Sequence, residues 1–210
     1  MSFIKVCGIT TKEQALEIAK MEPTHIGVVH FEKSPRHTDI CQIEEIKSAI
    51  EKQPVKLVAV VVNPSKELVD ELLKVADIIQ FHGDEDLDFI KQFDKEKVIK
   101  AIRVKDEKSL KDIERFSKEG YLVLIDAFKK GEYGGTGKQI DKSLVKKVSN
   151  ITDKFILSGG LSEENVYELI REFKPFGVDA SSKLEVEAGI KDLNKVKRYI
   201  LQAKKAFKEI

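Results

Sequence analysis

The segment KLVAVVV, from Lys56 to Val62, is the strongest strand signal in the sequence. All of its residues after the first are apolar, so both faces of a strand formed here would be buried. A strand that is buried on both faces is typical of a parallel sheet. The segment therefore predicts a buried parallel strand, and the rest of the chain is interpreted outward from it.

Short apolar runs of the same kind recur on both sides of this segment, and each is followed by a helical pattern. The other expected strands are Ile4 to Cys7, His25 to Phe31, Ile78 to Phe81, Val98 to Val104, Leu122 to Asp126, Phe155 to Leu157 and Gly177 to Ala180. The chain thus contains eight strand–helix units of roughly 25 residues each, a size that suits a small barrel. Strict alternation of strands and helices implies a parallel sheet with helices outside it.

Two α/β architectures fit this alternation. A doubly wound open sheet usually carries a glycine fingerprint after its first strand, and Gly8-Ile9-Thr10 supplies none. Eight units in 210 residues fit one closed barrel instead. We therefore expect a single (β/α)8 TIM barrel, with residues 1–210 as one domain.

Residues that favour helix ends follow most of the expected strands. Asn63-Pro64 is expected to cap a helix and open its first turn, Thr38 or Asp39 to cap another, and Asp84 to start a third. Gly120 is expected to end the helix that runs from Asp106 to Lys118.

The composition restricts the partners that the chain can have. A formal net charge of +1 gives no bulk electrostatic reason to expect nucleic acid or an anionic membrane. Two cysteines, Cys7 and Cys41, are too few for a disulfide framework, and Cys41 is expected to be structural in the second helix. No apolar run reaches the length of a membrane span, so we expect a cytoplasmic protein, either a monomer or a homodimer.

Polar residues stand where the expected strands end. In a barrel these positions converge on one face, which is where barrel enzymes carry out their chemistry. Cys7 and Asp126 are then a candidate proton-transfer pair, and Arg36, stiffened by Pro35, can bind a carboxylate through two parallel hydrogen bonds. For Cys7 alone, a small buried hydrophobe is the common alternative. Its place among these groups favours a role in catalysis.

The loops after the last two strands resemble a phosphate-binding device. Gly159 and Gly160 let backbone N–H groups approach an anion closely, and Ser181-Ser182 can open a short extra helix after the strand that contains Asp179. We expect these five residues to bind substrate. An ordinary tight turn is the alternative for either loop alone.

The sequence favours chemistry without a metal or another cofactor. The four histidines, His25, His30, His37 and His82, show no pair with metal-ligand spacing. Each taken singly is more simply a packed or solvated imidazole. A general base and a general acid on opposite sides of a substrate can catalyse an isomerisation by themselves.

Seven motifs in order resemble the phosphoribosylanthranilate isomerase family of tryptophan biosynthesis over nearly the whole chain. They are KVCGIT (5–10), SPR (34–36), QFHGDE (80–85), LID (124–126), GGTG (134–137), LSGGL (157–161) with Asn165-Val166, and GVDASS (177–182). The resemblance implies an Amadori rearrangement of N-(5-phosphoribosyl)anthranilate to the carboxyphenylamino deoxyribulose phosphate, without a cofactor.

The resemblance also implies roles for individual residues. Asp126 would protonate the furanose ring oxygen, Cys7 would remove the C2′ proton, and Arg36 would hold the anthranilate carboxylate. His82, in the QFHGDE motif, would contact substrate. The chain departs from the family at Lys183, where glycine is usual, at His30, and after Gly137.

Two other functions remain open. A related histidine-pathway isomerase on the same fold would have an aspartate at the position of Cys7, and the thiol argues against it. A non-catalytic or altered-specificity phosphosugar-binding barrel is the other alternative, and Lys183 is the feature that favours it.

Overall fold

The computed structural model describes residues 2–127 and 141–210. Its eight barrel strands are β1 (Phe3–Cys7), β2 (His25–Val29), β3 (Lys56–Val61), β4 (Ile78–Phe81), β5 (Val98–Val104), β6 (Leu122–Ala127), β7 (Phe155–Leu157) and β8 (Gly177–Ala180). All neighbouring strands are parallel, and β1 pairs with β8 to close the barrel. The closed barrel confirms the expected fold and excludes the doubly wound sheet.

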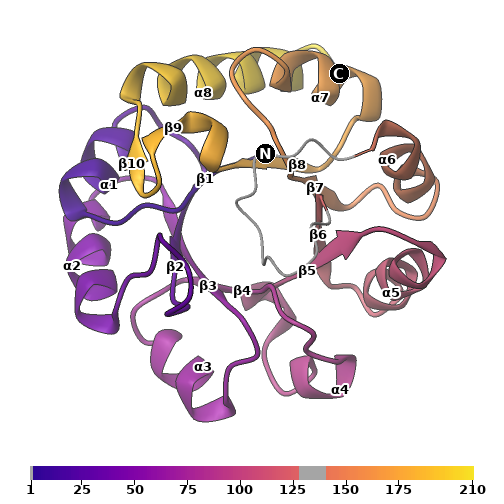
Figure 1. Ribbon diagram of the computed structural model, residues 1–210, viewed down its shortest axis with the longest axis horizontal. Coiled ribbons are helices and arrows are strands. Elements are labelled where there is room, and N and C mark those ends of the chain that lie inside the picture. Colours follow the sequence, from indigo (N-terminus) through magenta and orange to yellow (C-terminus); the bar gives the residue numbers. More distant parts are fainter. Residues whose placement is uncertain (1, 128–140) are drawn as a thin grey trace.

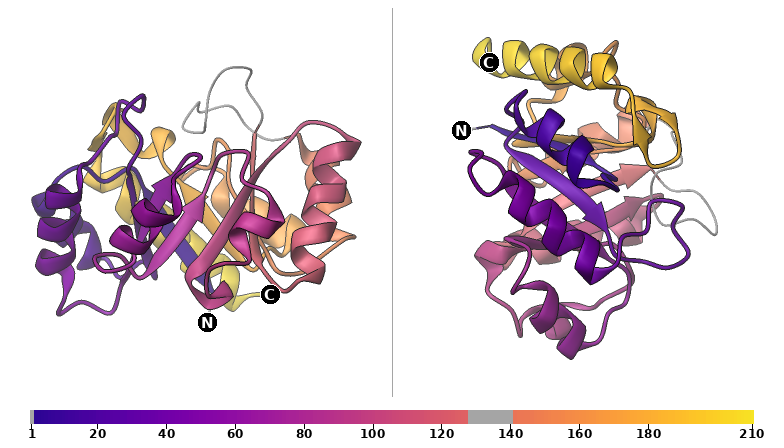
Figure 2. Two further views of the ribbon diagram at one scale, coloured as in Figure 1. Left: turned by 90° about the horizontal axis from the view of Figure 1, so that it is seen from below. Right: turned by 90° about the vertical axis from the view of Figure 1, so that its left-hand side faces the viewer.

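Helices follow the strands and surround the barrel, as Figure 1 shows. They are α1 (Lys12–Ala19), α2 (Ile40–Ile50), α3 (Lys66–Leu72), α4 (Leu87–Ile90), α5 (Glu107–Lys118), α6 (Lys142–Ser149), α7 (Val166–Phe173) and α8 (Leu193–Lys208). Short 3₁₀ turns η1 (Lys95–Lys97) and η2 (Ser182–Leu184) precede β5 and follow β8. The C-terminus lies on the same side of the barrel as the start of β1 (Figure 2).

Most helices begin at a side chain that accepts a hydrogen bond from the first turn, which explains why their positions follow from the sequence. Asp39 caps α2 in a capping box with Gln42, and Gly120, with φ +86°, follows α5 as expected. Two expected starts are wrong. Ser65 caps α3 because Asn63 adopts a left-handed conformation (φ 48°), and Asp86, not Asp84, caps α4.

The strands bury two separate apolar surfaces. The outer faces pack against the helices, while Phe3, Val58, Ile99, Leu124 and Ile156 are among the side chains that fill the barrel itself. Since alternate residues of a strand point to opposite faces, Lys5 and Cys7 share the inner face with Phe3, and Asp126 shares it with Leu124. The apolar interior thus gives way to polar groups toward the carboxyl ends of the strands.

A two-stranded hairpin, β9 (Glu185–Glu187) and β10 (Ile190–Lys191), lies between η2 and α8 and was not expected from the sequence. Cys41, expected to be structural, is exposed. Among the described residues, no helix is both long enough and apolar enough to cross a bilayer.

Candidate active site

The carboxyl ends of the strands bring the two candidate proton-transfer groups to one mouth of the barrel. Cys7 is the last residue of β1, and Asp126 is near the end of β6. Both side chains are nearly buried, with residue exposures of 7% and 6%. The strands that carry them are not neighbours in the barrel, so a ligand in the mouth would lie between the thiol and the carboxyl group.

The surroundings of Cys7 combine burial with positive charge. Burial raises the pKa of the thiol above its usual value, while the Lys5 ammonium is the largest of the groups that lower it. Gly8, with φ +79°, turns the chain immediately after the thiol. Cys7 therefore terminates the strand beside a sharp turn, as the sequence predicts.

Lys5, Gln80 and Asp179 form a polar layer inside the barrel, below the level of Cys7. The Lys5 ammonium donates to Oε1 of Gln80 at 2.9 Å and to Oδ2 of Asp179 at 3.1 Å, and all three residues are buried. Asp179, expected to bind substrate, therefore pairs with a lysine of the barrel interior. Lys5 and Gln80 were missed as candidates, although each is a polar residue inside an otherwise apolar strand.

The contacts of Gln80 favour one tautomer of His82. An ammonium can only donate, so Gln80 must present Oε1 to Lys5 and its amide N–H groups to Nδ1 of His82, 3.5 Å away. Nδ1 then accepts, and the proton of a neutral imidazole is on Nε2, which lies 3.4 Å from Oδ2 of Asp126. Among the described residues, Nε2 makes no hydrogen bond. The buried N–H of His82 therefore faces the carboxyl group of the candidate acid.

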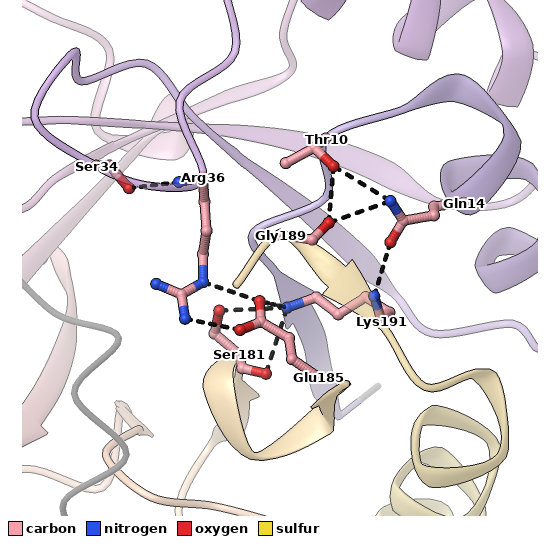
Figure 3. A network of polar contacts seen from close by, with 8 residues as sticks. All are labelled: Thr10, Gln14, Ser34, Arg36, Ser181, Glu185, Gly189 and Lys191. Carbon is pink, nitrogen blue, oxygen red and sulfur yellow. Dashed lines mark hydrogen bonds and ion pairs between the residues drawn. The ribbon is translucent and has the colours of Figure 1, made fainter. Parts of the chain in front are cut away.

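Arg36 makes the two-bond fork that its sequence context predicts, but it makes it within the protein. Its Nε and Nη2 donate to the two carboxylate oxygens of Glu185 at 2.8 and 2.7 Å, and the Lys191 ammonium also donates to Oε1 of Glu185 (Figure 3). Burial raises the pKa of Glu185, but Arg36 and Lys191 together hold it below its usual value. Two cations thus share one carboxylate, which leaves a net positive charge.

The β9–β10 hairpin places Glu185 and Lys191 at the mouth. The carbonyl of Gly189 accepts from Thr10 Oγ1 at 2.7 Å and from Gln14 Nε2 at 3.2 Å, and Gln14 Oε1 accepts from the Lys191 backbone at 2.9 Å (Figure 3). The start of α1 therefore fixes the hairpin against β1. Sequence reasoning missed Glu185 and Lys191 because these long-range contacts leave no local pattern.

The two late loops have the geometry expected of an anion site. Gly159 and Gly160 have φ values of +93° and +68°, which favour glycine, and Asn165 donates to the Gly160 carbonyl at 3.1 Å. In the described parts of the chain, the backbone N–H groups of Gly159, Gly160, Ser182 and Lys183 find no acceptor. These donors remain available to a phosphate.

The departures from the family pattern are compatible with this geometry. Lys183 lies in η2 and is not among the residues with a left-handed backbone, so no strain arises there. Nδ1 of His30 is 2.9 Å from the Thr38 carbonyl, and His25 stacks on Phe3 with the ring centroids 3.8 Å apart. The GGTG motif at 134–137 lies outside the described residues.

No group of three or more metal-ligating side chains gathers within residues 2–127 and 141–210. The donors at the mouth are instead a thiol, a carboxyl group, an imidazole and cations. Such a set can move protons and bind anions.

Gly27 provides a test of how tightly the thiol is packed. A Cβ at this position would lie 2.7 Å from Sγ of Cys7 and 2.8 Å from Cε of Lys5. We expect Gly27→Ala to lower the free energy of unfolding in urea by about 1–3 kcal/mol, as overpacking usually does. In a Cys7→Ala background the same change should have a smaller effect, because the sulfur is gone. Equal effects in both backgrounds would contradict the packing.

The comparisons with known proteins identify the family. The family model described as N-(5'phosphoribosyl)anthranilate (PRA) isomerase matches residues 4–202. The chain belongs to the PRA isomerase family. The PRA isomerase of a Sulfurihydrogenibium species is 57% identical over 197 residues, which are 94% of this chain and 96% of that protein.

Solved PRA isomerase structures share the fold. That of Thermotoga maritima has a TM-score of 0.86 at 33% identity and covers 98% of this chain and 100% of its own. A PRA isomerase in complex with reduced 1-(o-carboxyphenylamino)-1-deoxyribulose 5-phosphate has a TM-score of 0.83 at 30% identity, with the same coverage. The family resemblance, the isomerase class and the barrel expected from the sequence are thereby confirmed.

Proposed function

We propose that the chain catalyses the Amadori rearrangement of N-(5'-phosphoribosyl)anthranilate, with Asp126 as general acid and Cys7 as general base. The observation that carries the proposal is the position of this thiol and this carboxyl group on the inner face of one barrel mouth, in a member of the PRA isomerase family. The product is 1-(2-carboxyphenylamino)-1-deoxyribulose 5-phosphate, an intermediate of tryptophan biosynthesis.

The enzyme supplies two proton transfers. Asp126 gives its proton to the furanose ring oxygen, the bond from that oxygen to C1′ breaks, and the lone pair of the anthranilate nitrogen forms the C=N bond of a protonated Schiff base. The Cys7 thiolate then takes the C2′ proton; the electron pair of that C–H bond forms a C1′=C2′ double bond, and the C=N pair returns to nitrogen. The resulting enolamine tautomerises to the ketone when the proton of its C2′ hydroxyl moves to C1′. The Nε2–H of His82, 3.4 Å from Oδ2 of Asp126, stabilises the carboxylate left by the first transfer.

Two sets of donors at the mouth bind the substrate, and Lys191 lies between them because it donates both to Glu185 and to Ser181. The backbone N–H groups of Gly159, Gly160 and Ser182 hold the phosphate, and Ser181 opens the second of these loops. Asp179 acts indirectly, through Lys5. Arg36 binds the anthranilate carboxylate with the guanidinium edge that Glu185 leaves open, since Nη1 points away from Glu185 in Figure 3.

Arg36→Lys tests the carboxylate contact. Lysine keeps the charge but loses the planar fork, so we expect KM to rise by about 10–100-fold, the loss of a hydrogen bond to a charged group, with a smaller change in kcat. The control is Arg198→Lys, at an exposed arginine that pairs with Glu163 at 3.0 Å. A KM that does not change in Arg36→Lys would contradict this contact.

The direct test of the function is to incubate the purified protein with phosphoribosylanthranilate and to follow the loss of its anthranilate-type fluorescence. Turnover supports the proposal. Binding without turnover would favour a non-catalytic phosphosugar-binding barrel, and turnover of only the histidine-pathway aminoaldose substrate would favour the related isomerase.

The same proposal covers partners and location. The substrate is a small phosphosugar held by local donors, and a net charge of +1 gives no general attraction for nucleic acid or membranes. We propose a cytoplasmic enzyme that acts as a monomer or a homodimer. Sedimentation of the purified protein distinguishes the two assemblies.

A further inference from the structure

The two proton-transfer steps leave the buried Lys5 without a role. Lys5 lies inside the barrel with no exposed surface, and its side chain is on the same face of β1 as Cys7, one layer below it. A buried ammonium lowers stability unless polar groups compensate it. Gln80 and Asp179 supply such groups at 2.9 and 3.1 Å.

Gly27 brings Lys5 and Cys7 together. The position that a Cβ of Gly27 would occupy is 2.7 Å from the sulfur and 2.8 Å from Cε of Lys5. Because glycine leaves this position empty, the thiol and the end of the lysine side chain both approach the same point of β2. The end of the Lys5 side chain therefore lies near the sulfur, while its ammonium donates to Asp179.

The contacts of Lys5 favour its ammonium form despite burial, because Gln80 and Asp179 both present oxygen acceptors to Nζ. Burial lowers the pKa of Lys5, but the negative charges of Asp179 and of an ionised Cys7 raise it above its usual value. Burial in turn raises the pKa of Asp179, and Lys5 is the largest of the groups that lower it.

We propose that Lys5 is the positioning residue for the general base: its buried ammonium holds and stabilises the Cys7 thiolate from beneath, while Asp179 and Gln80 hold the ammonium. The inference rests on the proposed function for the use of the thiolate, but the effect of Lys5 on the sulfur does not depend on that use. Lys5 stays away from the substrate and acts through Cys7.

The charges around Cys7 predict the direction in which the loss of each group shifts the pKa of the thiol. Burial has the largest effect on the pKa of the Cys7 thiol and raises it. Lys5 has the next largest effect and lowers this pKa; Asp179 raises it, and Lys191 from β10 lowers it. Arg36, from the loop after β2, also interacts with the thiolate. Loss of Lys5 and loss of Asp179 should therefore shift the titration of Cys7 in opposite directions.

The test measures this titration directly. The exposed Cys41 is first replaced by serine in every protein, so that only Cys7 contributes thiolate absorbance in the ultraviolet. The Cys7→Ala protein in the same background supplies the baseline. The variants are Lys5→Met, Asp179→Asn and the double variant Lys5→Met/Asp179→Asn, which removes both charges and avoids an unpaired buried carboxylate if Lys5→Met does not fold.

An opposite charge this close typically shifts a pKa by about 1–3 units. We therefore expect the midpoint for Cys7 to rise by a unit or more in Lys5→Met, which is about a tenfold or greater loss of thiolate at neutral pH. It should rise less in the double variant and fall in Asp179→Asn. The rising limb of kcat/KM against pH should move with these midpoints.

Lys100→Met/Glu85→Gln is the matched control, because Lys100 and Glu85 form another buried ion pair, with Nζ and Oε2 2.7 Å apart. It should leave the midpoint of Cys7 unchanged. Equal midpoints in the wild type, the double variant and Asp179→Asn would overturn the proposal and leave Lys5 as a structural partner of Asp179. If the midpoints shift as expected in a protein that does not turn over phosphoribosylanthranilate, the proposed function fails and the role of Lys5 stands.

Discussion

Asp126→Asn should lower turnover of phosphoribosylanthranilate by about 10²–10⁴-fold, the usual contribution of one proton-transfer group. The carboxyl group is nearly buried at the end of β6, and an amide there keeps the shape of the side chain but cannot supply the proton that opens the furanose ring. Because His82 Nε2–H lies 3.4 Å from Oδ2, the amide can orient its oxygen toward that donor, so the fold should be retained.

Steady-state fluorescence and a urea unfolding curve check this prediction together. Asp84→Asn is a suitable control, because Asp84 is an exposed carboxylate that pairs with Arg103 at 2.8 Å. It should turn over at the rate of the wild type. A wild-type rate in Asp126→Asn would remove Asp126 from the mechanism.

Cys7→Ala should cause a loss of similar size, about 10²–10⁴-fold, because no other thiol can take the C2′ proton. Cys7→Ser should be nearly as slow, since an alcohol ionises far less readily than a thiol beside Lys5. Cys41→Ala, at the exposed cysteine, should leave turnover unchanged and is the control.

A second readout separates the loss of a base from the loss of packing. Cys7→Ala should bind the reduced product analogue about as tightly as the wild type, because the phosphate and carboxylate contacts lie elsewhere. If binding falls as much as turnover, the sulfur would be a structural element of the mouth and not a base.

The barrel could be predicted from the sequence because its determinants are local. Apolar runs such as Lys56–Val61 form the strands, and capping side chains such as Asp39 and Asp106 start the helices that follow. The errors are also local. Asn63 resembles a helix cap in sequence, but it adopts the left-handed conformation that asparagine tolerates, and Ser65 becomes the cap.

At the mouth of the barrel, only the residues at or just after the ends of strands could be predicted from the sequence. Cys7, Asp126 and the Gly159-Gly160 turn directly follow or end apolar runs. Lys5 and Gln80 lie inside such runs, and their importance depends on which strands meet across the barrel. Glu185 reaches Arg36 over 149 positions of the chain, by way of a hairpin whose strands are too short to leave a pattern.

The central claim is a division of work between two groups: Asp126 opens the ring, and Cys7 then removes the C2′ proton. Borohydride trapping tests it, because this reagent reduces an open-chain Schiff base to a stable amine and leaves the closed furanose intact. With stoichiometric Cys7→Ala and substrate, we expect the reduced open-chain adduct to accumulate; with Asp126→Asn, we expect little of it. Equal amounts from the two variants, or more from Asp126→Asn, would contradict the assignment.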